Sequence, residues 1–332
     1  MSAESKSSSK HSRLVALDYT RAFAILLVVA GHWNPPPEPL WWYQCFRIIY
    51  TFHMPLFLAI SGFLYMYTRK QKGHLSFLKG KFNRLMIPYF FTSLIIITIK
   101  LLSQNTAYVE HPVNLLTYLE ILYSPSAGYF LWFMWALWWM FVIIPFFKSR
   151  KTRTILFLVS FVLHFMPWSA TDIFCLWQTQ RMLVYFMCGI MLYDWKHLIP
   201  TNTKCWAFIL GCLFIVLEVA YVYDIDWTKY ILAFISIPLF PALFRVIEPS
   251  VSKNQHRLLM TISSASFFIY LFHTTFDGFV KSAARPLLSL NNDLVYALLI
   301  IVAVAVGTII PTWLAIKVLN RWKLTRWMFG LK

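Results

Sequence analysis

The stretch LDYTRAFAILLVVAGHWNPPPEPLWW, residues 17–42, begins as an apolar helix of the kind that crosses a bilayer. It nevertheless carries Asp18 and Arg21 near its start and His32 at its far end. Ionisable side chains inside an apolar span are costly to bury, and they generally serve a function. The stretch therefore predicts a membrane protein whose first span contains part of a functional site.

The rest of the chain has a matching composition. Of its 332 residues, 59% are hydrophobic and only 13% are charged, and the mean hydropathy is +0.61, which is not typical of a soluble domain. We predict an all-α integral membrane protein with one membrane domain, residues 14–320, between a disordered polar tail, 1–13, and a basic tail, 321–332. Apolar runs predict ten spans, near residues 15–33, 46–67, 86–102, 129–147, 154–168, 182–194, 205–223, 230–246, 263–280 and 294–319.

The positive charges predict the orientation of these spans. Most of the 30 Lys and Arg residues fall in the N-terminal tail and in every second loop, such as 68–85 and 148–153, whereas the loops between them hold almost none. Cytoplasmic loops carry such an excess, so we predict that both termini are cytoplasmic. Topology thereby accounts for the net charge of +17, and nucleic-acid binding is not needed to explain it.

Arg21 and His32 are predicted to share one face of the first span. Eleven residues correspond to about three helical turns and an axial separation of roughly 16 Å. Asp18 lies one turn before Arg21, close enough for an ion pair that lowers the cost of burying the guanidinium group. The alternative is that Arg21 snorkels to the interface and that His32 only meets interfacial water.

Other polar residues lie at the ends of other spans. Lys81 and Arg84 precede the third span, where they either bind an anionic cofactor or only follow the charge rule. Arg181 lies at the outer end of the sixth span, where that rule predicts no cation. The remaining candidates at the outer ends or within spans are His53, Ser61, Gln180 and His273. The two histidines could instead be core residues that bond a backbone carbonyl.

Histidines near the outer side and cations near the inner side suggest chemistry that crosses the bilayer. Histidine is a good general base for a hydroxyl nucleophile, and the basic side suits an activated acyl donor with a phosphorylated carrier. A metal site built from the histidines is an alternative, but no cluster of carboxylates accompanies them, so we predict none.

The chain resembles the membrane-bound acyltransferase-3 family. The similarity covers, in order, LDYTRAFAILLVVAGH, FHMPLFLAISGFL, KFNRLMIPYF, LWFMWALWWM, RMLVYFMCG and SFFIYLFHT, which begin at residues 17, 52, 81, 131, 181 and 266. The second of these is especially similar to the fucose-4-O-acetylase-like branch. One departure is that many members carry Arg-x-x-Arg below the third span, where this chain has Lys81 and Arg84.

The resemblance implies a ten-helix O-acyltransferase of the bacterial inner membrane. Its donor is usually cytoplasmic acetyl-CoA, its acceptor is a hydroxyl of a surface or lipid-linked glycan, and no cofactor stays bound. His32 matches the family's essential histidine and Arg21 its essential arginine. We further expect an acyltransferase module alone, with glycan-assembly proteins as possible partners, and the size of the acyl group stays open.

The expected mechanism is direct transfer, in which His32 removes the proton of the acceptor hydroxyl as it attacks the thioester. A covalent acyl-histidine is the variant. Arg21, Lys81 and Arg84 are predicted to hold coenzyme A. His53, Gln180, Arg181 and His273 are predicted to contact the acceptor or the transition state, with Asp18 and Ser61 in support.

Transport is the competing class of function. An exporter of glycan intermediates or small acyl compounds would share the topology and the intramembrane charges. A transporter has no use for coenzyme A or for a base aligned with an inner arginine, and no inverted repeat is evident. A sensor or scaffold with a degenerate site is disfavoured because both Arg21 and His32 are present.

Overall fold

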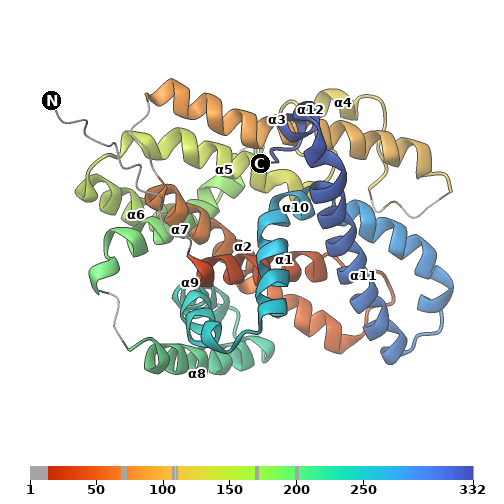
Figure 1. The fold of residues 1–332 in the computed structure, drawn as a ribbon. Helices are drawn as coiled ribbons and strands as arrows, with labels where there is room; N and C mark the ends of the chain where they lie inside the picture. Colours follow the sequence, from red (N-terminus) through yellow and green to blue (C-terminus); the bar gives the residue numbers. More distant parts are fainter. Residues whose placement is uncertain are drawn as a thin grey trace.

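The computed structural model describes residues 14–68, 73–106, 109, 111–168, 172–198 and 202–331, and most of them lie in helices (Figure 1). Within these ranges there is no β-strand. The predicted all-α fold class is therefore confirmed. The N-terminal tail, residues 1–13, lies outside the described residues.

Seven helical segments among the described residues are long and apolar enough to cross a membrane. They are α2 (Leu40–Tyr67), α3 (His74–Ser103), α5 (Trp132–Ile143) with its flanking 3₁₀ turns, α8 (Thr203–Val222), α9 (Thr228–Ile247), α10 (Lys253–Leu288) and α11 (Asp293–Trp313) with the turns that follow it. Three shorter or more polar helices, α1 (Val15–Gly31), α6 (Arg150–Phe165) and α7 (Leu176–Asp194), complete the correspondence with the ten expected ranges. Two small helices are α4 (Thr117–Glu120) and α12 (Lys323–Met328).

Two helices begin well before the apolar runs that predicted them. The basic lead of α3 is helical from His74, because Phe77 packs against Tyr65 and Phe141 at ring distances of 5.8 and 6.1 Å. The start of α10 is fixed by a capping box, in which Ser252 and Gln255 each bond the other's backbone N–H. Side-chain contacts, which hydropathy does not report, set both boundaries.

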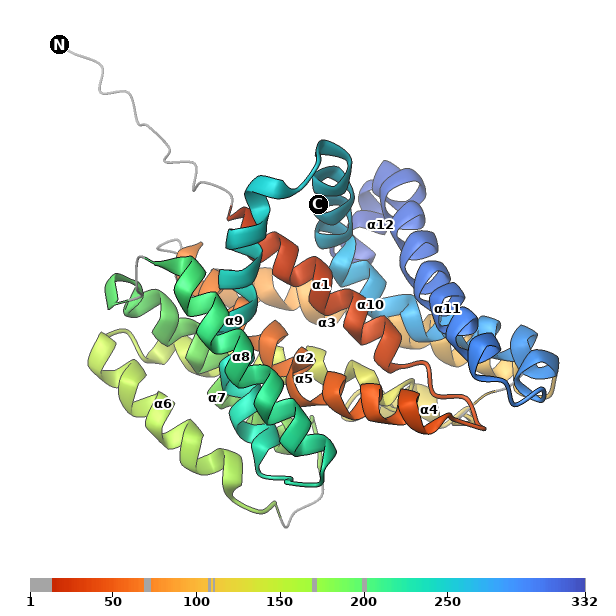
Figure 2. The ribbon, with the colours of Figure 1, turned by 90° about the horizontal axis from the view of Figure 1, so that it is seen from below.

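Helix α1 lies between α2 and α9 on one side and α10 and α11 on the other (Figure 2). Eight of its 17 residues are buried and none is exposed. By contrast, α6 and α8 lie at one flank and α11 at the other (Figure 2). Most apolar side chains of α8 are exposed or only partly buried. The segment that carries the candidate site is thus held from several sides.

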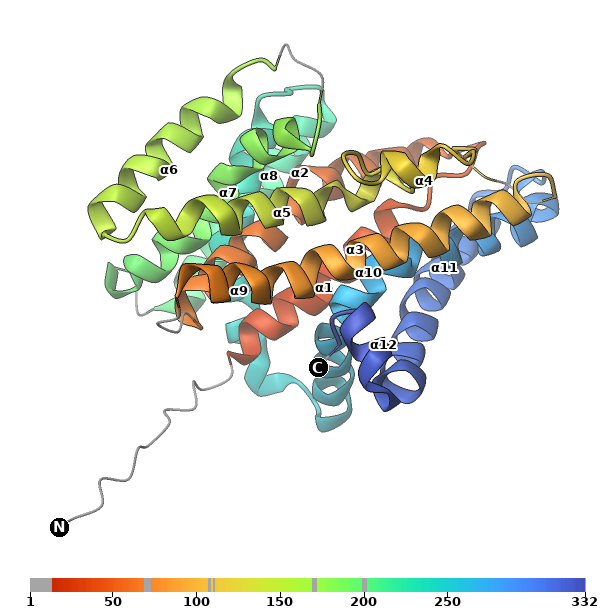
Figure 3. The ribbon, with the colours of Figure 1, turned by 90° about the horizontal axis from the view of Figure 1, so that it is seen from above.

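Helices α2 and α7 approach each other closely at two glycines. A Cβ atom on Gly62 would lie 2.0 Å from the Phe186 carbonyl oxygen, and one on Gly189 would lie 1.8 Å from that of Ala59. Only glycine allows this separation. On the side of the molecule opposite to the one seen in Figure 2, α3 and α5 run next to each other (Figure 3).

Candidate active site

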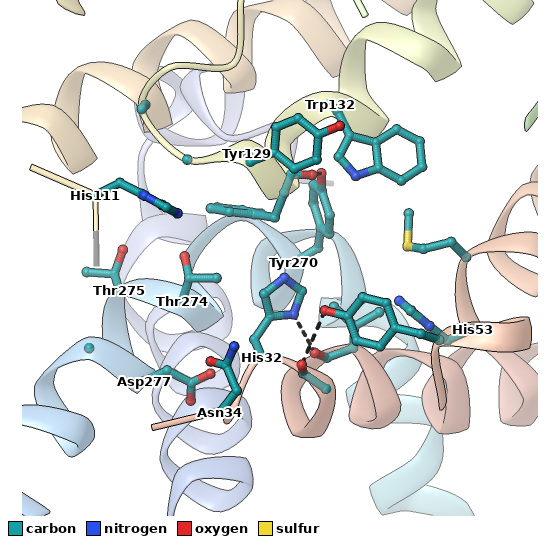
Figure 4. A pocket seen from close by; sticks show the side chains of 18 of the residues that line it. His32, Asn34, His53, His111, Tyr129, Trp132, Tyr270, Thr274, Thr275 and Asp277 are labelled. Atoms are coloured by element: carbon teal, nitrogen blue, oxygen red, sulfur yellow. Dashed lines mark hydrogen bonds between the residues drawn. The ribbon is translucent and has the colours of Figure 1, made fainter. Parts of the chain in front are cut away.

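The ends of several helices, on the side away from the start of α1, surround a cavity of about 570 Å³ (Figure 4). Its lining comes from the end of α1, the first half of α2, the end of α3, the start of α5 and the second half of α10. Further lining residues come from α6, α7, α8 and α9. Residues far apart in the sequence thus meet around one space.

His32 stands in this cavity directly after the last turn of α1 (Figure 4). Its Nδ1 lies 2.8 Å from the carbonyl oxygen of Val28. A carbonyl can only accept, so Nδ1 donates, and the neutral ring carries its lone pair on Nε2. The end of α1 thereby selects the tautomer that a general base requires.

His273 packs against the His32 ring from α10. The two ring centroids are 4.6 Å apart in an edge-to-face arrangement, and Nδ1 of His273 donates to the Tyr270 carbonyl at 2.8 Å. The His273 side chain is completely buried and does not line the cavity. The structure therefore brings the two predicted histidines together, with His273 behind the ring of His32.

His53 lines the same cavity on another side of His32 (Figure 4). It donates from Nδ1 to the Ile49 carbonyl at 2.7 Å, and its ring packs against Tyr50 at 4.7 Å. The Tyr50 hydroxyl in turn donates to the carbonyl of Gly31 at 3.2 Å. Ser61 is further down α2, bonded to the Phe57 carbonyl at 2.9 Å, and is not among the lining residues.

Two further lining residues, Asp277 and Lys281, were not predicted from the sequence. Both carboxylate oxygens of Asp277 are buried, and neither has a hydrogen-bond partner among the described residues. Lys281 donates to the carbonyl of His32 at 2.8 Å and to the Asn34 side chain at 3.0 Å. With His273 they form a row at four-residue spacing on α10. The pattern His-x₃-Asp-x₃-Lys within an apolar run could therefore have identified both residues from the sequence.

Arg181 and Gln180 lie close together in the sequence but differ in position. Arg181 lines the cavity, with its guanidinium group 5.1 Å from the centre of the Trp177 ring. Gln180 lies outside the lining and donates to the carbonyls of Leu163 and Met166, at 2.9 and 3.0 Å. It joins the start of α7 to the end of α6.

Arg21 lies at the other end of α1 and does not line the cavity. Its guanidinium group donates to Asp18 at 2.9 Å, which confirms the predicted ion pair, and to the Ser263 hydroxyl at 2.8 and 3.0 Å. Ser263 itself donates to Asp18 at 2.8 Å. Because Arg21 faces Ser263 and His32 faces His273, both residues point toward α10, as their predicted common face requires.

Lys81 and Arg84 occupy different environments on α3. The Lys81 ammonium group lies 3.6 Å from the centre of the Phe141 ring. Arg84 is exposed and lines a second, shallower hollow with Lys323 and Arg326 near the C-terminal helix α12. Neither Lys81 nor Arg21 lines that hollow.

The arrangement suits proton transfer at a hydroxyl group. A histidine with a defined tautomer and a buried carboxylate line one cavity, and aromatic side chains surround them, among them Tyr129, Trp132 and Tyr270 (Figure 4). In the part of the chain that the structure describes, no three His, Cys, Asp or Glu side chains are grouped so as to hold a metal ion.

Comparison with known proteins points to one family. A family described as "Acyltransferase domain" matches residues 14–316. Nodulation protein NolL of Sinorhizobium fredii is 25% identical over 276 residues, which cover 78% of this chain and 68% of that protein. Nodulation protein NolL of Mesorhizobium japonicum is 29% identical over 139 residues, or 40% of this chain and 36% of that protein. No solved structure matches the chain.

Proposed function

The chain belongs to the acyltransferase domain family, and we propose that it is a membrane O-acyltransferase that moves an acyl group, acetyl in the first instance, from cytoplasmic acyl-CoA to a hydroxyl of a surface or lipid-linked glycan. The observation that carries this proposal is His32, held by the Val28 carbonyl in a cavity large enough for a sugar unit. Of the described histidines that line the cavity, only His32 directly follows the end of a helix.

The proposed chemistry balances through His32. Nε2 accepts the proton of the acceptor hydroxyl while the hydroxyl oxygen attacks the thioester carbonyl. The new bond joins that oxygen to the acyl carbon, the carbon–sulfur bond breaks, and the proton returns to the coenzyme A thiolate. Lys281 holds the backbone carbonyl of His32, which keeps the end of α1 in position.

Acceptor and donor are proposed to approach from opposite sides. Asp277, a carboxylate without a described partner, accepts hydrogen bonds from acceptor hydroxyls beside His32. Arg21, Lys81 and Arg84 at the basic side hold the phosphates of coenzyme A, and the pantetheine arm extends along α1 over roughly 16 Å. Gln180, His53 and His273 then act by positioning side chains and helices around the acceptor.

We propose ten spans with both termini in the cytoplasm of a bacterium, and a location in its inner membrane. The basic loops support this orientation, and no described residue of the basic stretches 73–85 and 148–153 lines the cavity. Residues 14–320 form the membrane domain in this account, and α12 with Phe329 packs the basic C-terminal segment against α3 and α10. Glycan-assembly proteins are the proposed partners.

The test is transfer of radiolabel from acetyl-CoA into extractable glycans by membranes that contain wild type or His32→Ala. We expect a loss of at least about 100-fold in His32→Ala, the usual contribution of a general base. His197→Ala is the matched control, because His197 is exposed and far from the cavity lining. Undiminished transfer by His32→Ala would rule out the assignment, and silence of the wild type with all acyl-CoA donors would favour transport.

A further inference from the structure

The cavity around His32 is lined by more positive than negative side chains. Among the described lining residues, Asp277 is the one carboxylate, and the cations are Lys100, Arg181, Lys229 and Lys281. They come from four helices and lie at the ends opposite the basic loops. The positive-inside rule gives no reason for cations at these ends, so their presence calls for another explanation.

Two of these cations have structural partners. Lys281 binds the His32 carbonyl and Asn34, and Lys100 donates to the His111 carbonyl at 3.3 Å. Arg181 and Lys229 differ, because neither forms an ion pair with any residue that the structure describes. Their charged groups instead lie over the rings of Trp177 and Tyr230, at 5.1 and 5.3 Å.

Carboxylates near this part of the cavity are engaged elsewhere. Asp224 and Asp226 lie 3.0 and 3.9 Å from the Arg47 guanidinium group, which also covers the Tyr221 ring. Asp172 accepts from the Trp177 backbone N–H at 3.0 Å. None of these carboxylates forms an ion pair with Arg181 or Lys229.

Aromatic rings surround the two cations and hold their helices together. His164 donates to the Arg181 carbonyl at 2.5 Å and packs against Tyr185 and Tyr230 at 5.3 and 5.5 Å. Tyr185, Tyr221 and Tyr230 all line the cavity. Aromatic faces suit sugar rings, and Arg and Lys bind phosphate or carboxylate through charge-assisted hydrogen bonds.

We propose that the acceptor is an anionic glycan whose phosphate or carboxylate binds Arg181 and Lys229 while its reacting hydroxyl reaches His32. This inference rests on the proposed function, since it takes the cavity to be the acceptor site. Positive side chains at the outer side of the membrane then select substrates by charge. The acyl-transfer step itself is unchanged.

The test measures binding of glucose 1-phosphate and of glucose to the full chain in phosphatidylcholine nanodiscs by calorimetry. We expect the phosphorylated sugar to bind at least about tenfold more tightly, which corresponds to about 1.4 kcal/mol. Arg181→Gln and Lys229→Gln should each weaken its binding by about tenfold and leave glucose unaffected. Lys253→Gln, at an exposed lysine on the opposite end of α10, is the matched control.

The inference would be overturned by equal affinity for the two sugars, or by a loss of affinity in Lys253→Gln as large as in Arg181→Gln and Lys229→Gln. It would also be overturned if coenzyme A displaced glucose 1-phosphate and this displacement required Arg181 and Lys229. The last result would assign the two cations to the donor. A separate transfer assay with His32→Ala keeps the two proposals apart. If acyl transfer depends on His32 but the chain shows no preference for the anionic sugar, only this inference is wrong. If binding of glucose 1-phosphate depends on Arg181 but no acyl transfer occurs, only the proposed function is wrong.

Discussion

At the residue scale, the site depends on how each polar group is satisfied. His32, His53 and His273 all donate from Nδ1 to backbone carbonyls, but only His32 follows the end of its helix, whereas His53 and His273 lie within theirs. The same hydrogen bond therefore occurs at different depths, since His53 and His273 are buried and His32 is only partly buried.

We expect Asp277 to contribute to binding of the acceptor and not of the donor. Asp277→Asn keeps the shape of the side chain but replaces one oxygen with an NH2 group, so we expect the KM for the acceptor to rise about tenfold, as for the loss of a buried hydrogen bond. The KM for acetyl-CoA should not change. Initial rates with the glycan fraction that the wild type labels provide the measurement, and Asp293→Asn, at an exposed carboxylate on α11, provides the control. A change in both KM values, or in neither, would contradict the role given to Asp277.

Part of the site could be predicted from the sequence at this scale. The Asp18–Arg21 pair follows from i,i+3 spacing, and the structure confirms it. Asp277 and Lys281 were missed because neither belongs to a motif, and their importance depends on burial next to a residue about 250 positions earlier, as the His32–Lys281 bond shows. Such long-range contacts follow from tertiary packing, which periodicity does not reveal.

At the element scale, the sequence predicted which segments are helical better than where they begin. Apolar runs predicted the positions of α1, α8 and α9 closely, because apolar residues extend over nearly the whole of each helix. Helices α3 and α10 have polar ends that are held by aromatic packing and by a capping box, so hydropathy underestimated their length. The capping sequence at Ser252 could have revealed the start of α10.

The close contact of α2 and α7 should be destabilised by a side chain larger than hydrogen at Gly189. In Gly189→Ala the new methyl group would meet the Ala59 carbonyl, and the helices would have to separate, at a cost of about 1–3 kcal/mol. The apparent Tm of the purified protein should fall. Gly80→Ala is the control, because nothing lies within 4 Å of its Cβ position, and it should be neutral or stabilising. Equal Tm values for both variants would contradict the packing described here.

At the scale of the whole molecule, the two ends of α1 lie far apart and face the same partner helix. The Arg21 end meets Ser263, and the His32 end meets His273 and Lys281. Helices α1 and α10 thus run in the same direction and join a basic side to a cavity with aromatic walls. This arrangement fits a reaction whose donor and acceptor arrive from opposite sides of a membrane.

The most direct test of this account is transfer across a sealed membrane. Vesicles with the basic loops outside receive radiolabelled acetyl-CoA externally, and the glycan acceptor is enclosed within. We expect label to reach the enclosed glycan with wild type and to fall by at least about 100-fold with His32→Ala. Transfer that proceeds only when donor and acceptor share one side, or that does not depend on His32, would contradict it.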